Sequence, residues 1–218
     1  MSAEETRRRI VDAALRLFET QGYAGTTMRA VAAEAGVAPS HAYYFFAGKD
    51  QLVQELYERI QRDHRTRAAA VLVPGGSLAE RLLAVERAYL EVVAPYHSFG
   101  QAFVSTALVP GAAASPLSEE SGPARELSRA IHAEVVAGAE PRVPRRLAAV
   151  LPDLLWLSHL LLTLHWVADE TPGQRRTHLL VERSVALLAQ AVRVSRLPGA
   201  AGLVDRVAGV LDVVVPGR

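Results

Sequence analysis

Residues 27–49 restrict the possible folds of this chain more than any other segment, because they contain two very short helical segments joined by a tight turn. The first begins at the Thr26-Thr27 pair, either of which can cap a helix, and ends just before Gly36. The second opens at Pro39, a residue favoured at the first helical position because no N–H donor is needed there. An aromatic run and the only lysine of the chain, Lys49, follow. This layout predicts a helix-turn-helix motif.

A helix-turn-helix that binds DNA lays its second helix in the major groove, so one side of that helix must pack inward. We expect Ala42, Phe46 and one face of Tyr43 to pack inward. The groups expected to face outward, towards bases or phosphates, are Ser40, His41, Tyr44 and the hydroxyl of Tyr43. Thr27 and Lys49, on either side of the groove, are expected to bind phosphates. The motif therefore predicts DNA binding.

Helical periodicity continues through the rest of the chain, and we find no alternation typical of β-strands. Ser2 and Glu5 form a capping box for a first helix that ends at Gly22. A longer helix is expected over 50–71. Further helices are expected at 77–94, 96–109, 118–138, 144–169 (with a division at Pro152 left open), 172–196 and 201–214. The expected breaks include Pro95, Pro110 to Pro116, Gly138 to Pro144, Pro172-Gly173 and Pro198-Gly199. The sequence thus predicts an all-α fold.

Residues 5–57 resemble the tetracycline-repressor (TetR) family of bacterial transcription regulators. The matching residues are Thr6-Arg7, Ile10 to Ala14, Leu17-Phe18, Gly22-Tyr23, Thr26-Thr27, Val31-Ala32, Ala35 to Val37, Tyr43, Phe46, Lys49 and Leu52. Many positions agree in order and spacing. The resemblance implies an all-α homodimer, in which residues 1–48 form a three-helix helix-turn-helix DNA-binding domain. Residues 49–218 would then form a helical ligand-binding and dimerisation domain.

The resemblance also implies which residues touch DNA. These are Thr27, Pro39, Ser40, His41, Tyr43, Tyr44 and Lys49. To them we add Arg29, for which a phosphate contact and an ordinary surface position are equally open. Ala38 departs from the family pattern, because the usual Ser or Thr cap is missing and the start of the helix is weakened by ~1 kcal/mol. The alternative, an ordinary helical hairpin with its aromatic residues packed inside, is disfavoured by the match on both sides of the motif.

Composition limits the other function classes. The net charge of +1 neither supports nor excludes DNA binding, and residues 1–50 hold as many acidic as basic side chains. Without cysteine, the chain cannot form disulfides, thiol nucleophiles or Cys-ligated zinc sites. The longest apolar run, 154–168, is shorter than the ~20 residues that a membrane span needs. We expect a cytoplasmic protein with no membrane partner.

No catalytic motif emerges, so we expect neither enzymatic activity nor a cofactor. The histidines considered in the C-terminal region are His97, His132, His159, His165 and His178. His159 and His165 are expected on one helix, but their spacing places them about 120° apart around it. That separation does not suit a shared metal ion, so we expect no metal site. Buried or half-exposed structural histidines are the favoured interpretation.

Aromatic and neutral polar residues suggest a ligand pocket in the C-terminal domain, because small-molecule sites are mostly apolar with a few polar groups. The candidate ligand-binding residues are Tyr89, Phe103, Trp156 and His159. Core packing is the commoner role for any one of them. We expect the small-molecule effector to be hydrophobic or aromatic.

Residues 154–167 are apolar nearly all round, so this helix must be covered on several sides. With the helix at 172–196 it is expected to form an intersubunit four-helix bundle. A homodimer also suits DNA reading, since two short helices ~34–36 Å apart can read a palindrome. The alternative is that this surface belongs to an intramolecular core.

These observations predict a ligand-responsive transcriptional repressor that binds a palindromic double-stranded DNA operator as a homodimer. A small hydrophobic ligand would release it by binding better to a conformation unsuited to DNA. One alternative is a ligand-independent or activating DNA-binding regulator. Another is a helical ligand carrier or enzyme in which the helix-turn-helix is incidental.

Overall fold

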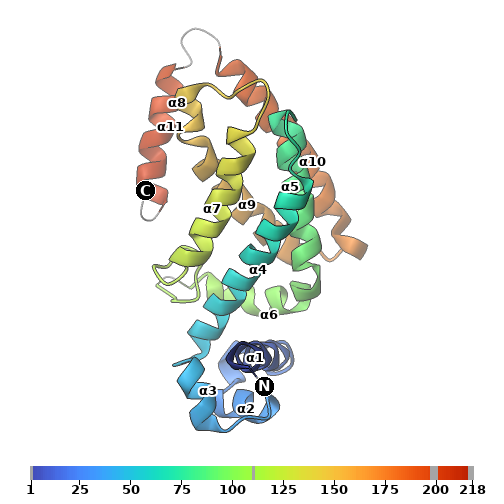
Figure 1. The fold of residues 1–218 in the computed structure, drawn as a ribbon, viewed down its shortest axis with the longest axis vertical. Coiled ribbons are helices and arrows are strands. Elements are labelled where there is room, and N and C mark those ends of the chain that lie inside the picture. Colours follow the sequence, from blue (N-terminus) through green and yellow to red (C-terminus); the bar gives the residue numbers. More distant parts are fainter. Residues whose placement is uncertain (1, 110, 197–200, 216–218) are drawn as a thin grey trace. The chain divides into compact units, whose positions relative to one another are not determined.

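The computed structural model describes residues 2–109, 111–196 and 201–215, and these residues contain helices and no strand (Figure 1). The helices are α1 (Ala3–Gly25), α2 (Met28–Glu34), α3 (Pro39–Phe45), α4 (Lys49–Val71), α5 (Leu78–Val93), α6 (His97–Ala107), α7 (Gly122–Ala137), α8 (Arg145–Ala148), α9 (Leu151–Ala168), α10 (Arg175–Val194) and α11 (Ala201–Val214). Short 3-10 turns at Ala94–Tyr96 and Pro172–Gln174 precede α6 and α10. The all-α prediction is confirmed.

Contacts divide the chain into two compact units. Unit 1 comprises Met1–Ile60 and Pro95–Ala124, and unit 2 comprises Gln61–Ala94 and Arg125–Arg218. These packing units do not coincide with the predicted functional division between residues 48 and 49. The first part of α4 belongs to unit 1 because Leu52, Val53 and Leu56 are buried in its core. The functional division itself stays a prediction.

The apolar stripe of α1 forms the centre of unit 1. Ile10, Ala14 and Phe18 lie one helical turn apart and are almost fully buried. At the start of α1 the predicted capping box is present, with the Ser2 hydroxyl accepting from the backbone N–H of Glu5 at 3.1 Å. Helical geometry is interrupted at the predicted residue, Gly22, which has a φ of 74°. The chain resumes helical turns up to Gly25.

Two short helices, α2 and α3, pack against each other beside α1 (Figure 1). Thr27 caps α2 by accepting from the backbone N–H of Ala30 at 3.1 Å. Gly36, with a φ of 65°, makes the turn that ends α2, a conformation that glycine adopts without strain. Pro39 opens α3 as predicted, and Ala38 before it has no side-chain oxygen to cap the helix. The predicted helix-turn-helix is confirmed.

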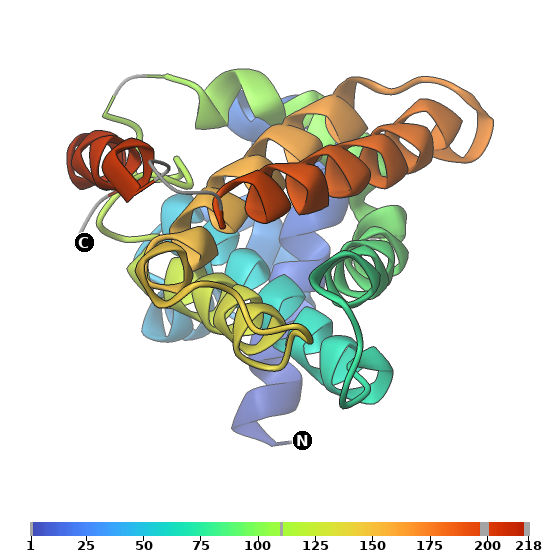
Figure 2. The same ribbon diagram turned by 90° about the horizontal axis from the view of Figure 1, so that it is seen from above.

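Unit 2 is built around α5, α9 and α10. α10 packs on both α5 and α9, and Figure 2 shows α9 and α10 running side by side. Among the described helices, α9 alone is long and apolar enough to cross a membrane, by length and composition only. Since α9 buries Trp156 and Trp166 and contacts α8 and α10, packing within unit 2 accounts for part of its apolar character.

Three predicted helix bounds differ from the structure. The segment predicted as 144–169 is divided after Ala148 rather than at Pro152, which lies in the first turn of α9, where proline is tolerated. The helix predicted over 172–196 begins only at Arg175, because Gly173 and Gln174 have positive φ values. The segment predicted from 118 becomes helical at Gly122. The predicted breaks at Pro110 and at Pro198-Gly199 involve residues outside the described ranges.

Asp169 links the end of α9 to the start of α10. Its carboxylate accepts from the backbone N–H and hydroxyl of Thr177, at 2.8 and 2.9 Å, and from those of Thr171, at 3.0 and 2.6 Å. Burial disfavours the charged carboxylate, but these four hydrogen bonds outweigh it and hold the pKa of Asp169 well below its ordinary value. The ionised form of Asp169 therefore stabilises the folded chain.

We predict that Asp169→Asn lowers the free energy of unfolding by about 1–3 kcal/mol at pH 7, because an amide cannot accept all four bonds. The folded-state pKa is lowered, so the contribution of Asp169 is complete above the unfolded-state pKa of ~3.9 and decreases as the pH falls below it. Urea unfolding at pH 7 and pH 3 should thus show a smaller difference between variant and parent at pH 3. Asp63→Asn, at an exposed position, is the control. An equal difference at both pH values would contradict this role.

Candidate functional site

The predicted DNA-contacting residues lie on α2, α3 and the first residue of α4. The α3 helix exposes its predicted outward side chains, and Tyr44 and Tyr43 are 81% and 54% exposed. Its opposite side is anchored by Ala42 and Phe46, which are buried in the core of unit 1, as predicted. Two neighbouring aromatic side chains exposed to this degree leave much of their apolar surface in water, so their position is consistent with an intermolecular contact.

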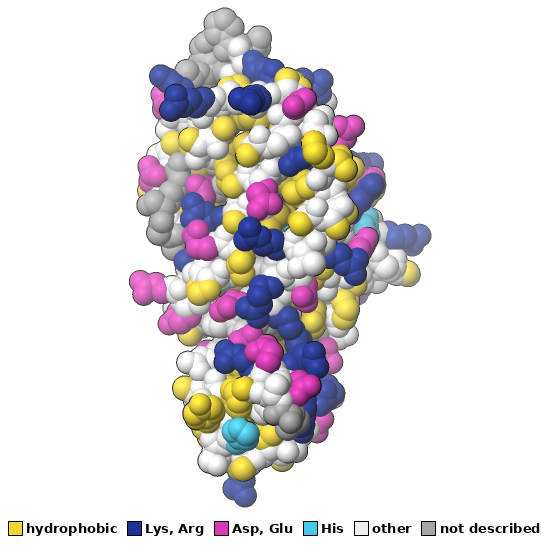
Figure 3. Space-filling model, in the orientation of Figure 1, with side chains coloured by type: hydrophobic (Ala, Val, Ile, Leu, Met, Phe, Trp, Pro, Cys, Tyr) yellow, Lys and Arg dark blue, Asp and Glu magenta, His cyan; other side chains and the backbone are white. Residues whose placement is uncertain are grey.

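The His41 ring packs between aromatic neighbours on α3. Its centroid lies 5.2 Å from that of Phe45 and 6.4 Å from that of Tyr44. Phe45 is half-buried against the core of unit 1, and its ring packs against the ring of His41. Figure 3 shows hydrophobic side chains beside a histidine on the part of unit 1 that carries α2 and α3, with basic side chains near them.

Lys49 has a structural contact that the sequence did not predict. Its Nζ donates to the backbone carbonyl of Tyr23 at 2.6 Å and lies 4.5 Å from the centroid of the Tyr23 ring. The Tyr23 hydroxyl donates to Asp50, and burial followed by this bond raises the pKa of Tyr23. The start of α4 is therefore fastened to the end of α1. An ammonium has three N–H donors, so the predicted phosphate contact of Lys49 is compatible with this bond.

Three arginines of α1 form ion pairs or hydrogen bonds within unit 1. Arg7 pairs with Glu55 at 2.5 Å and lies over the Phe46 ring, and Arg9 donates to the backbone carbonyl of Ala35. Arg16 pairs with Glu34 on α2 at 3.0 Å. These contacts hold α1 against the two helices of the motif. Arg29, one of the residues predicted to contact DNA, is exposed on α2.

The four candidate ligand-binding residues are not brought together in one unit. Phe103 belongs to unit 1, where its ring stacks on Phe99 with the centroids 5.1 Å apart and meets Tyr23 edge-on. Tyr89, Trp156 and His159 belong to unit 2. Tyr89 and His159 are in contact, with ring centroids 4.1 Å apart. Phe103 is part of the unit 1 core, and sequence alone could not separate it from the other three.

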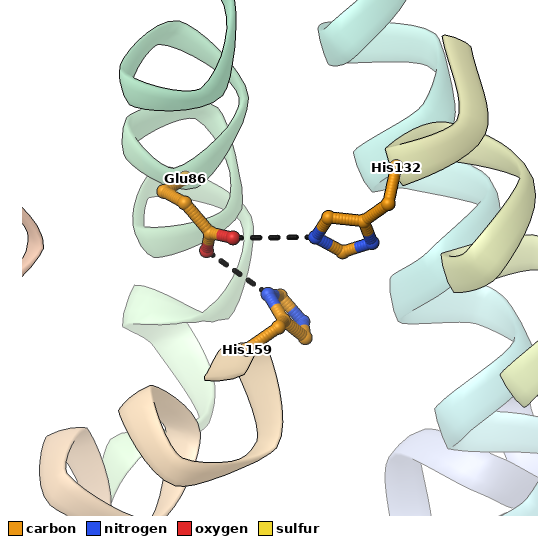
Figure 4. Close-up of side chains that lie close together, drawn as sticks. All are labelled: Glu86, His132 and His159. Carbon is orange, nitrogen blue, oxygen red and sulfur yellow. Dashed lines mark hydrogen bonds and ion pairs between the residues drawn. The ribbon is translucent and has the colours of Figure 1, made fainter. Parts of the chain in front are cut away.

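A buried polar cluster surrounds His159, and sequence reasoning missed its other members. Glu86 on α5 lies between His132 on α7 and His159 on α9, as Figure 4 shows. Its two carboxylate oxygens lie 3.3 Å from His132 Nε2 and 3.0 Å from His159 Nδ1. One signal was available: Glu86 follows Leu82 and Val85 at helical spacing, on the face of α5 that a globular protein buries.

Opposing effects act on the ionisation of this cluster. Burial alone would raise the pKa of Glu86, but electrostatic attraction by His159 and the hydrogen bonds with both histidines outweigh burial and lower this pKa. His64, on α4, stacks on the His159 ring with the centroids 5.8 Å apart. Burial, followed by repulsion from His159, lowers the pKa of His64 to about 3. The cluster thus holds an ionised carboxylate beside a neutral His64.

A pocket of about 320 Å³ lies among α5, α9 and α10. Leucine, valine and alanine side chains make up most of its lining, together with Ser158 and Ser184. Among the described residues that line it, Glu86 alone carries a charge. None of the four candidate ligand-binding residues belongs to this lining.

The predicted dimerisation helices expose a row of apolar side chains. Leu180, Leu187 and Val194 on α10 are exposed and lie seven residues apart, which places them on one helix face. Leu161 and Leu164 on α9 are also exposed. An apolar surface of this kind on adjacent helices is typical of a protein interface.

Two protein-family models match the chain. The model described as "Bacterial regulatory proteins, tetR family" matches residues 10–56, and the model "Tetracyclin repressor-like, C-terminal domain" matches residues 81–208. The second match alone covers more than half of the chain. Together the two matches include the helix-turn-helix and most of unit 2.

Curated relatives match over shorter stretches. The HTH-type transcriptional regulator BetI of Agrobacterium fabrum is 38% identical over 79 residues, which are 36% of this chain and 38% of BetI. The HTH-type transcriptional regulator AcrR of Shigella flexneri is 43% identical over 56 residues, 26% of each chain. The matched stretches span less than half the length of these relatives.

Solved structures share the fold over most of the chain. A TetR-family transcriptional regulator from Streptomyces coelicolor is 24% identical, covers 96% of this chain and 90% of its own, and has a TM-score of 0.61. A TetR transcriptional regulator from Nitrosomonas europaea is 19% identical, covers 85% and 99%, and has a TM-score of 0.66. At these identities the likeness concerns the fold alone.

Proposed function

Because the chain belongs to the tetracycline-repressor family of transcription regulators, we propose that it binds a palindromic DNA operator as a homodimer and is released by a small hydrophobic ligand. The observation that carries this proposal is the exposure of Tyr43 and Tyr44 on α3. The opposite side of this helix is anchored by the buried residues Ala42 and Phe46. Such a protein works in the cytoplasm, where it has access to the chromosome.

In the proposed complex, α3 lies in the major groove and the residues beside it hold the backbone. Ser40, His41 and Tyr44 contact bases, and the Tyr43 hydroxyl contacts a phosphate. The Thr27 oxygen accepts a backbone N–H in the cap of α2, and its hydroxyl proton is available to a phosphate. Lys49 and Arg29 add positive charge on either side, and Pro39 sets the approach of α3.

A homodimer supplies the second reading helix that a palindrome requires. The proposed interface is the exposed apolar row of α9 and α10, because removing apolar surface from water is favourable by about 25 cal/mol per Å². A face made of adjacent helices also suits the four-helix bundle expected from the sequence. The same face includes Leu187, which is 68% exposed.

The proposed effector site is the pocket among α5, α9 and α10, whose size lies within the usual range of ~300–1,000 Å³ for small-molecule sites. Its apolar lining favours a hydrophobic ligand. Leu187 belongs both to this lining and to the proposed dimer face, so an occupant of the pocket would alter the packing of the dimer. The ligand shifts DNA affinity only by binding the two conformations unequally.

Tyr44→Ala should change the base sequence that the protein selects from random duplex DNA, because the variant loses a side chain placed to contact base edges. Sequencing of the bound fragments measures this. Leu108→Ala, which alters another exposed apolar residue of unit 1, should leave the selected sequence unchanged. The same selected sequence for Tyr44→Ala and the parent would rule out base reading by Tyr44.

Lys49→Ala should weaken binding to all duplexes by a similar factor and reduce the slope of log K against log salt by about one, because one phosphate contact is lost. Lys49→Arg, which keeps the charge, should retain the slope. Binding is measured by fluorescence anisotropy at several salt concentrations, alongside thermal unfolding, since Lys49 also bonds to Tyr23. A lower unfolding temperature with an unchanged slope would limit Lys49 to a structural role.

Leu187→Glu should weaken the homodimer about tenfold or more, because a charge would be buried in the interface. Sedimentation equilibrium measures the association. Leu203→Glu is a matched control, since Leu203 on α11 is 65% exposed but lies outside the proposed face. If both variants remain dimeric like the parent, another surface forms the dimer.

A further inference from the structure

Three helices of unit 2 each contribute a side chain with a potential metal-ligating atom to one buried cluster. Glu86 on α5, His132 on α7 and His159 on α9 each offer one ligand atom, and these atoms lie within 4.8 Å of one another. All three side chains are buried, with exposures of 3% or less. Figure 4 shows the two imidazole rings turned towards the carboxylate from different helices. The sequence predicted no such grouping, because the three residues lie far apart along the chain.

The hydrogen bonds of His132 define which of its nitrogens faces Glu86 as a ligand. His132 Nδ1 lies 2.8 Å from the backbone carbonyl of Ser128. A carbonyl oxygen only accepts, so Nδ1 carries a proton and donates it. In neutral His132, Nε2 then presents a lone pair to a carboxylate oxygen 3.3 Å away. Two lone pairs repel each other at this distance unless a positive species, either a proton or a metal ion, lies between them.

The cluster also contains more imidazole nitrogen than its hydrogen bonds use. His159 Nδ1 lies beside Glu86, while His159 Nε2 is buried and has no hydrogen-bond partner among the described residues. His64 Nε2 faces the Val85 carbonyl at 3.1 Å, so its buried Nδ1 keeps a lone pair that no described residue contacts. Leaving such polar atoms unpaired in a core is costly. The polar groups of this core therefore exceed those that its hydrogen bonds satisfy.

We propose that Glu86, His132 and His159 form a binding site for one divalent transition-metal ion of the Zn²⁺, Co²⁺ or Ni²⁺ type. Imidazole nitrogen suits these ions, whereas Mg²⁺ and Ca²⁺ prefer sites built from oxygen. Two histidines and one glutamate leave a fourth coordination position open. The proposal concerns unit 2 alone and does not depend on DNA binding.

The spacing of the donor atoms suits such an ion. Ligands about 2.0–2.1 Å from a tetrahedral ion lie about 3.3 Å from one another. One carboxylate oxygen lies 3.3 Å from His132 Nε2 and the other lies 3.0 Å from His159 Nδ1. The three ligand atoms lie within 4.8 Å of one another, so they move closer together around a bound ion. The bond from His132 Nδ1 to the Ser128 carbonyl fixes the ring orientation, as outer-shell partners do in metal sites.

An ion also needs a route into the core. Glu86 lines the pocket among α5, α9 and α10, so this residue belongs to both the cluster and the pocket wall. An entry path of this kind is one requirement of a usable metal site.

The test is a titration of tag-free, full-length protein, stripped of metal with a chelator, with Co²⁺. We expect one Co²⁺ per chain, absorption bands typical of nitrogen and oxygen ligands, and displacement of Co²⁺ by Zn²⁺. Glu86→Gln and His132→Gln should each weaken binding by at least about a hundredfold. His178→Gln, which alters an exposed histidine of α10, should bind like the parent.

Circular dichroism establishes that each variant is folded. If a cluster variant unfolds, X-ray absorption of the Zn²⁺-loaded parent replaces it, and two imidazoles with one carboxylate in the inner shell are expected. No stoichiometric binding by the parent would overturn the proposal and leave a proton as the positive species in the cluster. Unchanged affinity in a folded Glu86→Gln or His132→Gln protein, or an inner shell without two imidazoles, would also overturn it.

Discussion

The exposed surface of α3 depends on the burial of Ala42 and Phe46 in the core of unit 1. α3 has seven residues, too few to keep a helical conformation in water by itself. The core of unit 1 holds both residues, and the α1 stripe forms the floor of that core. Since α3 is fixed on one side, its other side can carry exposed Tyr43 and Tyr44 without losing its position. The exposed aromatic surface is thus a consequence of the buried anchor.

Hydrogen bonds at the start of α4 form the second constraint on this surface. Lys49 and Asp50 tie the start of α4 to Tyr23 at the end of α1. α4 then continues without interruption to Val71, and its residues from Gln61 onwards belong to unit 2. In the proposed function, α4 is the helix that would carry a ligand-induced change from unit 2 to the motif. The size of that effect depends on how differently the ligand binds the two conformations.

Whether a feature could be predicted from the sequence depends on how far apart along the chain its interacting residues lie. The helix-turn-helix could be predicted because the Thr27 cap, the Gly36 turn and the Pro39 start are local signals. The cluster could not, because Glu86 meets His132 and His159 across 46 and 73 residues. Periodicity shows that such residues are buried, but it does not show what they meet. Phe103 was grouped with unit 2 aromatics for the same reason.

The two buried charged residues of α5, Arg81 and Glu86, have different kinds of partner. Arg81 donates to three backbone carbonyls, those of Val73, Glu134 and Val135, at 2.6, 2.9 and 3.0 Å. These partners neither titrate nor exchange, so Arg81 is a permanent tie between α5 and the end of α7. Glu86 instead depends on a proton or an ion shared with histidines of α7 and α9. The shared proton or ion therefore connects α5 with α7 and α9, and Glu86 also lines the pocket among α5, α9 and α10.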